Sequence, residues 1–161
     1  MPSNREIAEE LDLLAEEIEG EKRKERLIQM RKDALHLMFL LQDFHPLLIG
    51  SVWRGTPHKN SDIDIVTFHN EPTEILQKLR EGNIKIERTE WQSTTKQGQK
   101  KTSFHIHLTL PTENEVEIII RSPEEMGKPT KCEIYGDMAT GLDLKQLQQV
   151  LKENPLQKFV P

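Results

Sequence analysis

The sequence predicts an α/β (α+β) protein in which helices flank a mixed β-sheet. Two observations favour this fold class. Apolar residues recur at helical spacing near both ends of the chain, and between them they form the short or alternating runs that are typical of strands. A length of 161 residues suits one domain. We therefore expect a single domain over 1–161, with N-terminal helices at 1–45, an α/β core at 46–121 and a C-terminal segment at 122–161.

The first 45 residues are expected to form two helices. Ser3 and Glu6 make a capping-box pattern before apolar residues at helical spacing, and Gly20 interrupts that helix. The helical pattern then resumes until Pro46 ends it. Amphipathic helices usually pack on the sheet of their own domain, so we expect their apolar stripes to be covered there. A homo-oligomer formed through these helices is the alternative.

The core is expected to contain five strands and one helix. The predicted strands cover residues 47–49, 61–68, 84–94, 103–110 and 115–121. Pro72 suits the start of a helix that ends at Gly82, and the residues from Lys96 to Lys101 suit a basic hairpin turn. In the C-terminal segment, Asp143 is expected to cap a final amphipathic helix that Pro155 ends.

The composition restricts the classes of function. There are 22 Lys and Arg against 27 Asp and Glu, a net charge of −5, which disfavours a globally basic nucleic-acid binder. The single cysteine, Cys132, cannot form an intrachain disulfide, which fits a reducing compartment. No apolar run approaches the ~20 residues of a membrane span, and the N-terminus does not resemble a signal peptide. We therefore expect a cytoplasmic protein with no membrane partner.

Two aspartates mark the candidate site. Asp62 and Asp64 lie two residues apart in a predicted strand, so their carboxylates project side by side from one face. Carboxylates this close repel each other, and a cation between them removes the repulsion. Hard oxygen ligands with room for water and phosphate suit Mg²⁺.

Gly50 and Ser51 directly follow the apolar run at 47–49. A glycine there lets the backbone approach a ligand closely, and the serine hydroxyl and the following amides can bind phosphate oxygens. A phosphate site beside a metal-binding pair suits attack on a nucleoside triphosphate. Metal ions neutralise the triphosphate, activate an attacking hydroxyl and stabilise the leaving pyrophosphate. Arg54 follows closely and is a further candidate for nucleotide binding.

The pattern Gly50-Ser51, ten residues, Asp62-Ile63-Asp64 resembles the signature of the polymerase-β-type nucleotidyltransferase superfamily. The neighbouring Arg-Gly-Thr and Ser-Asp-Ile-Asp-Ile pieces look like its small stand-alone members, and the resemblance covers about residues 47–68. It implies a polymerase-β-like nucleotidyltransferase fold. It also implies an enzyme that moves a nucleoside monophosphate from an NTP, with ATP expected, to a hydroxyl and releases pyrophosphate.

The resemblance further implies roles for individual residues. Asp62 and Asp64 would bind two Mg²⁺ ions, and Gly50 and Ser51 would hold the β- and γ-phosphates. A third carboxylate, usually Asp, comes from a later strand in this family. Glu117 is the catalytic and metal-binding candidate for that place. Because Glu115 shares its face, Glu115 is the competing assignment.

The acceptor and the activity itself have alternatives. The resemblance implies a protein hydroxyl, an RNA end or a small molecule as acceptor. Minimal nucleotidyltransferase antitoxins, which adenylylate a partner toxin, carry the same spacing, so an antitoxin-like protein adenylyltransferase is one alternative. A catalytically silent nucleotide-binding regulatory module is another, and a structural partner protein acting through the N-terminal helices is a third. We expect His105 and His107 to be polar residues on the open face of the sheet; lining the active-site cleft is their alternative role.

Overall fold

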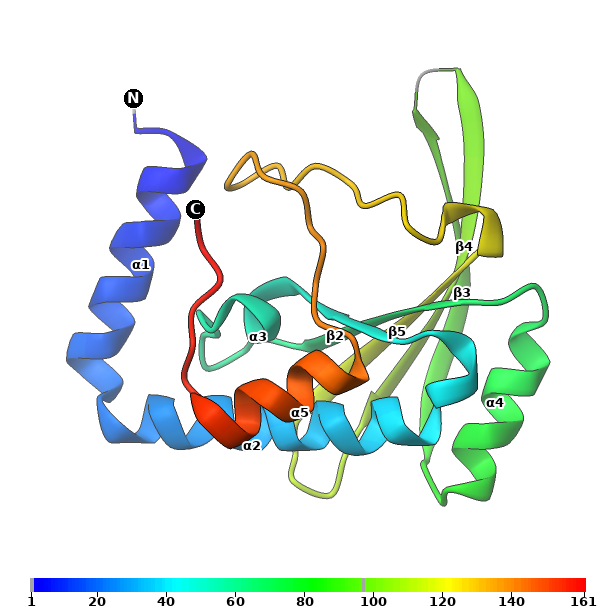
Figure 1. Cartoon of the computed structure of the whole chain (residues 1–161), viewed down its shortest axis with the longest axis horizontal. Coiled ribbons are helices and arrows are strands. Elements are labelled where there is room, and N and C mark those ends of the chain that lie inside the picture. Colours follow the sequence, from blue (N-terminus) through cyan, green and yellow to red (C-terminus); the bar gives the residue numbers. More distant parts are fainter. Residues whose placement is uncertain (1, 97) are drawn as a thin grey trace.

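The computed structural model describes residues 2–96 and 98–161, with the side chain of Lys96 left out. Helices and strands follow one another in the expected order, with one additional short helix, α3, in the core (Figure 1). The helices are α1 (Asn4–Glu19), α2 (Glu21–Leu40), α3 (Gly50–Arg54), α4 (Pro72–Glu81) and α5 (Leu144–Glu153), with short 3-10 turns at Gln42–Phe44 and Pro123–Glu125. The strands are β1 (Leu47–Ile49), β2 (Ile63–Phe68), β3 (Ile86–Lys96), β4 (Gln99–Thr109) and β5 (Glu115–Arg121).

The five strands form one mixed sheet in the order β1-β2-β5-β4-β3. The central pair, β2 and β5, runs parallel, and every other neighbouring pair is antiparallel. This arrangement confirms the predicted fold class, a mixed sheet flanked by helices. Since β2 and β5 are neighbours in space, residues about 50 positions apart in sequence lie side by side across their shared hydrogen bonds.

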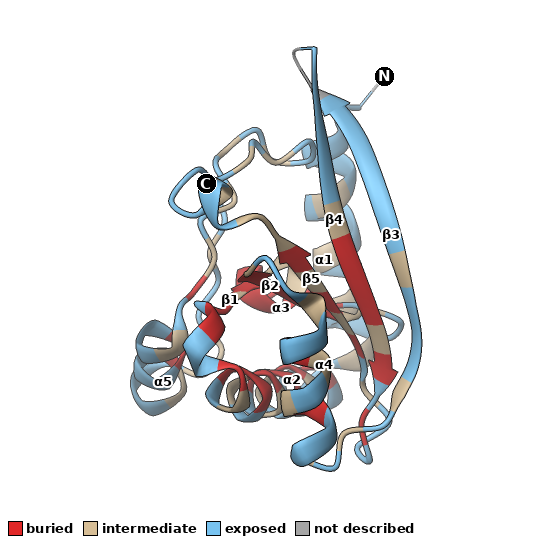
Figure 2. Ribbon diagram, turned by 90° about the vertical axis from the view of Figure 1, so that its right-hand side faces the viewer, coloured by how far each residue is buried: buried red, intermediate tan, exposed pale blue. Residues whose placement is uncertain are grey.

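The hydrophobic core lies between one face of the sheet and helices α2, α4 and α5 (Figure 2). From the sheet, Ile63, Ile65 and Ile118 point into this core and are fully buried. Because side chains alternate along a strand, the residues between them, including Asp64 and Glu117, point to the opposite face. The packing of the core therefore determines which side chains of β2 and β5 are available for chemistry.

A buried arginine ties α2 to α3 and to the end of the chain. The Arg31 guanidinium is fully buried and donates to four carbonyl oxygens, those of Val52, Trp53, Pro155 and Gln157, at 2.7–3.0 Å. Burial lowers the pKa of Arg31 to about 10, so the side chain keeps its charge at neutral pH. These bonds satisfy the polar groups at the C-terminal end of α3, and they fix the helix that begins at Gly50.

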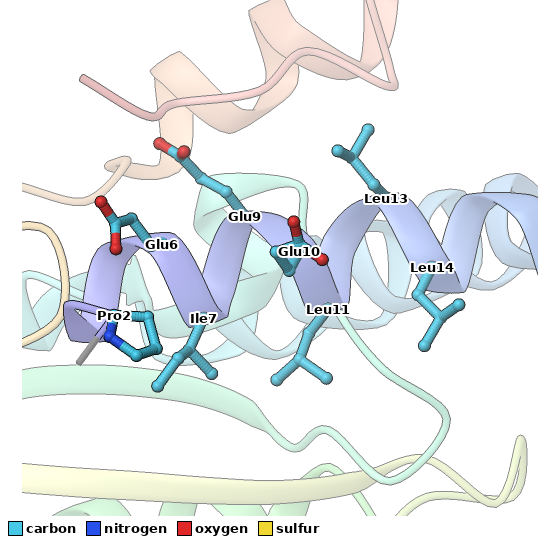
Figure 3. A pocket seen from close by; sticks show the side chains of 8 residues that line it. All are labelled: Pro2, Glu6, Ile7, Glu9, Glu10, Leu11, Leu13 and Leu14. Carbon is cyan, nitrogen blue, oxygen red and sulfur yellow. The ribbon is translucent and has the colours of Figure 1, made fainter.

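The apolar stripe of α1 is exposed, so the expectation that both N-terminal helices pack on the sheet is wrong for α1. All residues of α1 are described and none is buried, and Ile18 is 74% exposed. Figure 3 shows Ile7, Leu11 and Leu14 pointing to the same side of the helix. Gly20, with a positive φ of 52°, turns the chain between the two helices, and α1 lies beside the C-terminal segment, where Lys158 bonds to Asp12 and Glu16, rather than on the sheet (Figure 1). Pairing with a second copy through this stripe stays a prediction.

The β3–β4 hairpin is longer than expected. Its strands pair as far as Lys96 and Gln99, so most of the predicted turn is strand, and Gln97 lies outside the described residues. The β-branched run Thr94-Thr95 favours this extension, which projects beyond the rest of the sheet (Figure 2). None of the helices within residues 2–96 and 98–161 is long and apolar enough to cross a membrane.

Replacing Arg31 with Met should lower the free energy of unfolding by about 3 kcal/mol or more, because buried carbonyls lose their charged donor. Urea denaturation followed by circular dichroism measures this change. Arg80→Met, at an exposed position on α4, is the matched control and should change stability by less than about 0.5 kcal/mol. Equal effects of the two substitutions would contradict the structural role of Arg31.

Candidate active site

Three carboxylates converge near the N-terminal ends of the neighbouring parallel strands β2 and β5. Asp64 stands in register with Glu117 on β5 and with Ile49 on β1, and Asp62 immediately precedes β2. One oxygen atom from each of Asp62, Asp64 and Glu117 lies within 4.8 Å of the other two. The structure therefore brings together the three acidic residues that the sequence singled out, and their oxygens could hold a divalent cation.

Glu117, not Glu115, is the glutamate that reaches the aspartate pair. Parallel pairing places Glu117 directly beside Asp64. Glu115 is exposed and stands opposite Thr109 near the start of β5. The sequence leaves the pairing register of β5 open. Only the three-dimensional structure therefore distinguishes Glu117 from Glu115.

The cluster is electrostatically strained without a cation. Burial, followed by the charges of the nearby Glu117 and Asp62 carboxylates, raises the pKa of Asp64 to about 7. Both causes disfavour the ionised form of Asp64. A cation held by the three carboxylates would reverse this preference, because it would compensate the negative charges that repel one another.

Gly50 allows the start of α3 to lie directly against Asp64. Its φ is +76°, a conformation that favours glycine, and a Cβ atom built on it would lie only 2.6 Å from Oδ2 of Asp64. Any side chain at this position would displace the carboxylate. Ser51 follows on the same short helix and is half-buried. The expected close approach of backbone at Gly50 is thus an approach to the acidic cluster itself.

Arg54 is engaged inside the protein. Its guanidinium lies over the rings of Trp53 and Tyr135, 4.5 and 4.4 Å from their centres. It also donates to Asp137 at 2.6 Å and to the carbonyl oxygen of Phe159 at 3.0 Å. These contacts link α3 to the C-terminal segment. Nucleotide binding by Arg54 stays a prediction, and it would require the side chain to exchange these partners.

Two histidines of β4 lie on the same face as the acidic cluster. His105 is 7% exposed, and its Nδ1 lies 2.6 Å from Oε1 of Glu117. His107 lies closer to Glu90, with its Nε2 3.1 Å from Oε1 of that residue. The expectation of two polar residues on the open face of the sheet is wrong for His105, which is buried against Glu117. Neither alternation nor strand register alone reveals this contact, because Glu117 stands opposite His107 and bonds diagonally to His105.

Solved structures with a related arrangement share little sequence with this chain. A cytoplasmic RNA terminal U-transferase is 19% identical, with a TM-score of 0.40, over 70% of this chain and 34% of its own. The Cid1 poly(U) polymerase bound to MgGTP is 18% identical, with a TM-score of 0.41, over 73% and 38%. GLD-2 in its complex with RNP-8 is 13% identical, with a TM-score of 0.40, over 76% and 44%. The chain thus spans less than half the length of these proteins.

Comparisons with curated proteins and with protein families gave different results. Among curated proteins, none is significantly similar in sequence to this chain. The family described as "Nucleotidyltransferase domain" matches residues 40–137, which is more than half of the chain and includes β1, α3, β2 and β5. This match contains Gly50, Ser51 and all three clustered carboxylates. It confirms the recognition made from the Gly-Ser and Asp-Ile-Asp pattern: the chain belongs to the nucleotidyltransferase domain family.

Proposed function

We propose that this protein is a Mg²⁺-dependent nucleotidyltransferase that moves a nucleoside monophosphate from an NTP, with ATP expected, to a hydroxyl acceptor. The observation that carries the proposal is the convergence of one oxygen each from Asp62, Asp64 and Glu117 within 4.8 Å, beside a glycine that leaves no room for a side chain next to Asp64. Membership of the nucleotidyltransferase domain family supports it. Three carboxylate oxygens without sulfur or nitrogen ligands suit Mg²⁺ better than softer metal ions.

The order of the strands places Gly50 and Glu117 on opposite sides of Asp64. Asp64 lies on β2, between the β1 side, where Gly50 and Ser51 follow, and the β5 side, which carries Glu117. We place the β- and γ-phosphates on the Gly50 side and the acceptor hydroxyl on the Glu117 side. The α-phosphate then lies over Asp62 and Asp64, with the attacking and leaving oxygens on opposite sides of it, as in-line displacement requires.

The residues of this chain bind, orient and accept a proton in the proposed reaction. Asp62 and Asp64 would hold the metal ions, which when bound would supply charge neutralisation and lower the pKa of the acceptor hydroxyl. Glu117 would help to hold an ion on the acceptor side and would accept the proton of that hydroxyl. The acceptor oxygen bonds to the α-phosphorus, the bond from that phosphorus to the bridging oxygen breaks, and its electron pair leaves with pyrophosphate.

The acceptor is a protein hydroxyl, an RNA end or a small molecule. A third carboxylate beside the aspartate pair distinguishes a transferase from a catalytically silent nucleotide-binding module, so the position of Glu117 favours turnover. A net charge of −5 disfavours extensive contact with an RNA chain, so a short RNA end, a protein or a small molecule suits the surface better than a long RNA.

The activity is tested with NTPs labelled at the α-phosphate, incubated with the purified protein, Mg²⁺ and a cell extract that supplies RNA and protein acceptors. We expect label on a macromolecule or small product, and protease or nuclease sensitivity then identifies the acceptor class. Asp62→Asn with Asp64→Asn should lower labelling by at least roughly 100-fold, the scale of losing a preorganised electrostatic contact. Labelling by this double variant at the wild-type rate would contradict the proposal.

Gly50→Ala should weaken Mn²⁺ binding by roughly 10-fold or more, because the new methyl group displaces the Asp64 carboxylate. Gly136→Ala is the matched control. Gly136 has the same φ of +76°, but a Cβ there would meet no atom within 4 Å, so the two substitutions share the backbone strain and differ in the contact. Electron paramagnetic resonance of free Mn²⁺ measures the affinities. Equal losses in both variants would show that backbone strain, not the contact with Asp64, is responsible.

Without metal, the free energy of unfolding should fall as the pH rises from about 4 to 7. The pKa of Asp64 is about 7 in the folded protein against an ordinary value of 3.8, so the folded state binds the extra proton within this window. The effect amounts to a few kcal/mol, because each tenfold difference in proton affinity between the folded and unfolded states corresponds to about 1.4 kcal/mol.

Asp64→Asn should remove the slope of the free energy of unfolding against pH. It should also stabilise the metal-free protein at pH 8, as measured by urea denaturation in EDTA. Asp43→Asn, at an exposed position, is the control and should keep the slope. An unchanged slope in Asp64→Asn would mean that Asp64 is not the group whose pKa is raised in the cluster.

A further inference from the structure

We propose that His105 is a positioning residue that holds Glu117 in the orientation needed to bind the metal ion on the acceptor side. This inference rests on the proposed function. The geometry that carries it is a single contact: Nδ1 of His105 lies 2.6 Å from Oε1 of Glu117. His105 is buried, and the Glu117 side chain is only 22% exposed.

The contact follows from the antiparallel pairing of β4 with β5. Glu117 stands directly opposite His107, and His105 stands opposite Ile119, two residues along on the same face. The glutamate side chain nevertheless bonds diagonally to His105. His107 lies 3.9 Å from the same Oε1 atom and is hydrogen-bonded instead to Glu90 on β3. Only one of the two histidines thus holds the carboxylate.

A second hydrogen bond orients the imidazole ring. Nε2 of His105 lies 2.7 Å from the hydroxyl oxygen of Ser103. The ionised Glu117 carboxylate can only accept hydrogen bonds, so we assign the donating N–H to Nδ1. In the neutral ring Nε2 then accepts from the Ser103 hydroxyl. Ser103, His105 and Glu117 form a chain in which each member fixes the orientation of the next.

Glu117 needs this support because it is a glutamate. Compared with aspartate it has one more methylene group and one more rotatable bond, so fixing its carboxylate in one orientation costs more conformational entropy. The bond to Oε1 restricts the carboxylate and leaves Oε2 available to a cation. Carboxylates that bind metals are commonly held by such hydrogen bonds, and losing the partner typically costs roughly 10–100-fold in metal affinity.

The test measures Mn²⁺ affinity by electron paramagnetic resonance and needs no turnover. His105→Leu removes the donor and should weaken Mn²⁺ binding roughly 10-fold or more. His105→Asn keeps an N–H close to the place of Nδ1 and should bind Mn²⁺ within about threefold of wild type. Ser103→Ala leaves the ring without its second bond and should give an intermediate loss. His107→Leu is the matched control on the same strand and face, and should bind within about twofold of wild type.

Thermal unfolding shows whether each variant folds. If His105→Leu does not fold, the comparison of His105→Asn with Ser103→Ala provides the test. In the labelling reaction, added Mg²⁺ should restore the activity of His105→Leu. Wild-type affinity in folded His105→Leu, or an equal loss in His107→Leu, would overturn the positioning role. If the wild type binds Mn²⁺ and His105→Leu binds it weakly, but neither transfers label, the positioning role stands and the proposed transferase fails.

Discussion

Mutual repulsion among three carboxylates is the constraint on which the rest of the site depends. Asp62, Asp64 and Glu117 lie within 4.8 Å of one another, and burial with their shared charge moves the pKa of Asp64 to about 7. A protein optimised for stability alone would not keep such a cluster, because each carboxylate makes the others harder to ionise. The cluster becomes favourable once a cation is bound, which links the electrostatic strain of the metal-free protein to its proposed chemistry.

The fold maintains this strained arrangement with rigid elements. The parallel β2–β5 pairing places Glu117 beside Asp64, and the buried faces of both strands anchor them in the core. On the other side of Asp64, the four carbonyl bonds of Arg31 hold α3 and the segment that follows α5 against α2. Functional groups on packed strands and helices keep their geometry better than groups on loops. Helix α2, which carries none of the three carboxylates, thus helps to keep Gly50 against Asp64.

The sequence predicted those features that depend on local spacing. The alternation around Asp62 and Asp64, the apolar run before Gly50 and the capping patterns follow from the periods of strands and helices. Contacts between segments that are distant in the sequence were harder to predict. The choice of Glu117 over Glu115 and the bond from His105 depend on strand register, which many non-local contacts determine together. The exposed stripe of α1 depends on the turn at Gly20, and its helical spacing alone resembled that of a buried helix.

A crystal structure with Mn²⁺ and an ATP analogue that cannot be cleaved between the α- and β-phosphates would test the central claim most directly. The anomalous signal of Mn²⁺ distinguishes the ions from water. The account predicts two ions bridged by Asp62 and Asp64, one of them also bound by Glu117, with the β- and γ-phosphates beside Gly50 and Ser51. Ions bound elsewhere, or an analogue that binds away from the three carboxylates, would contradict it.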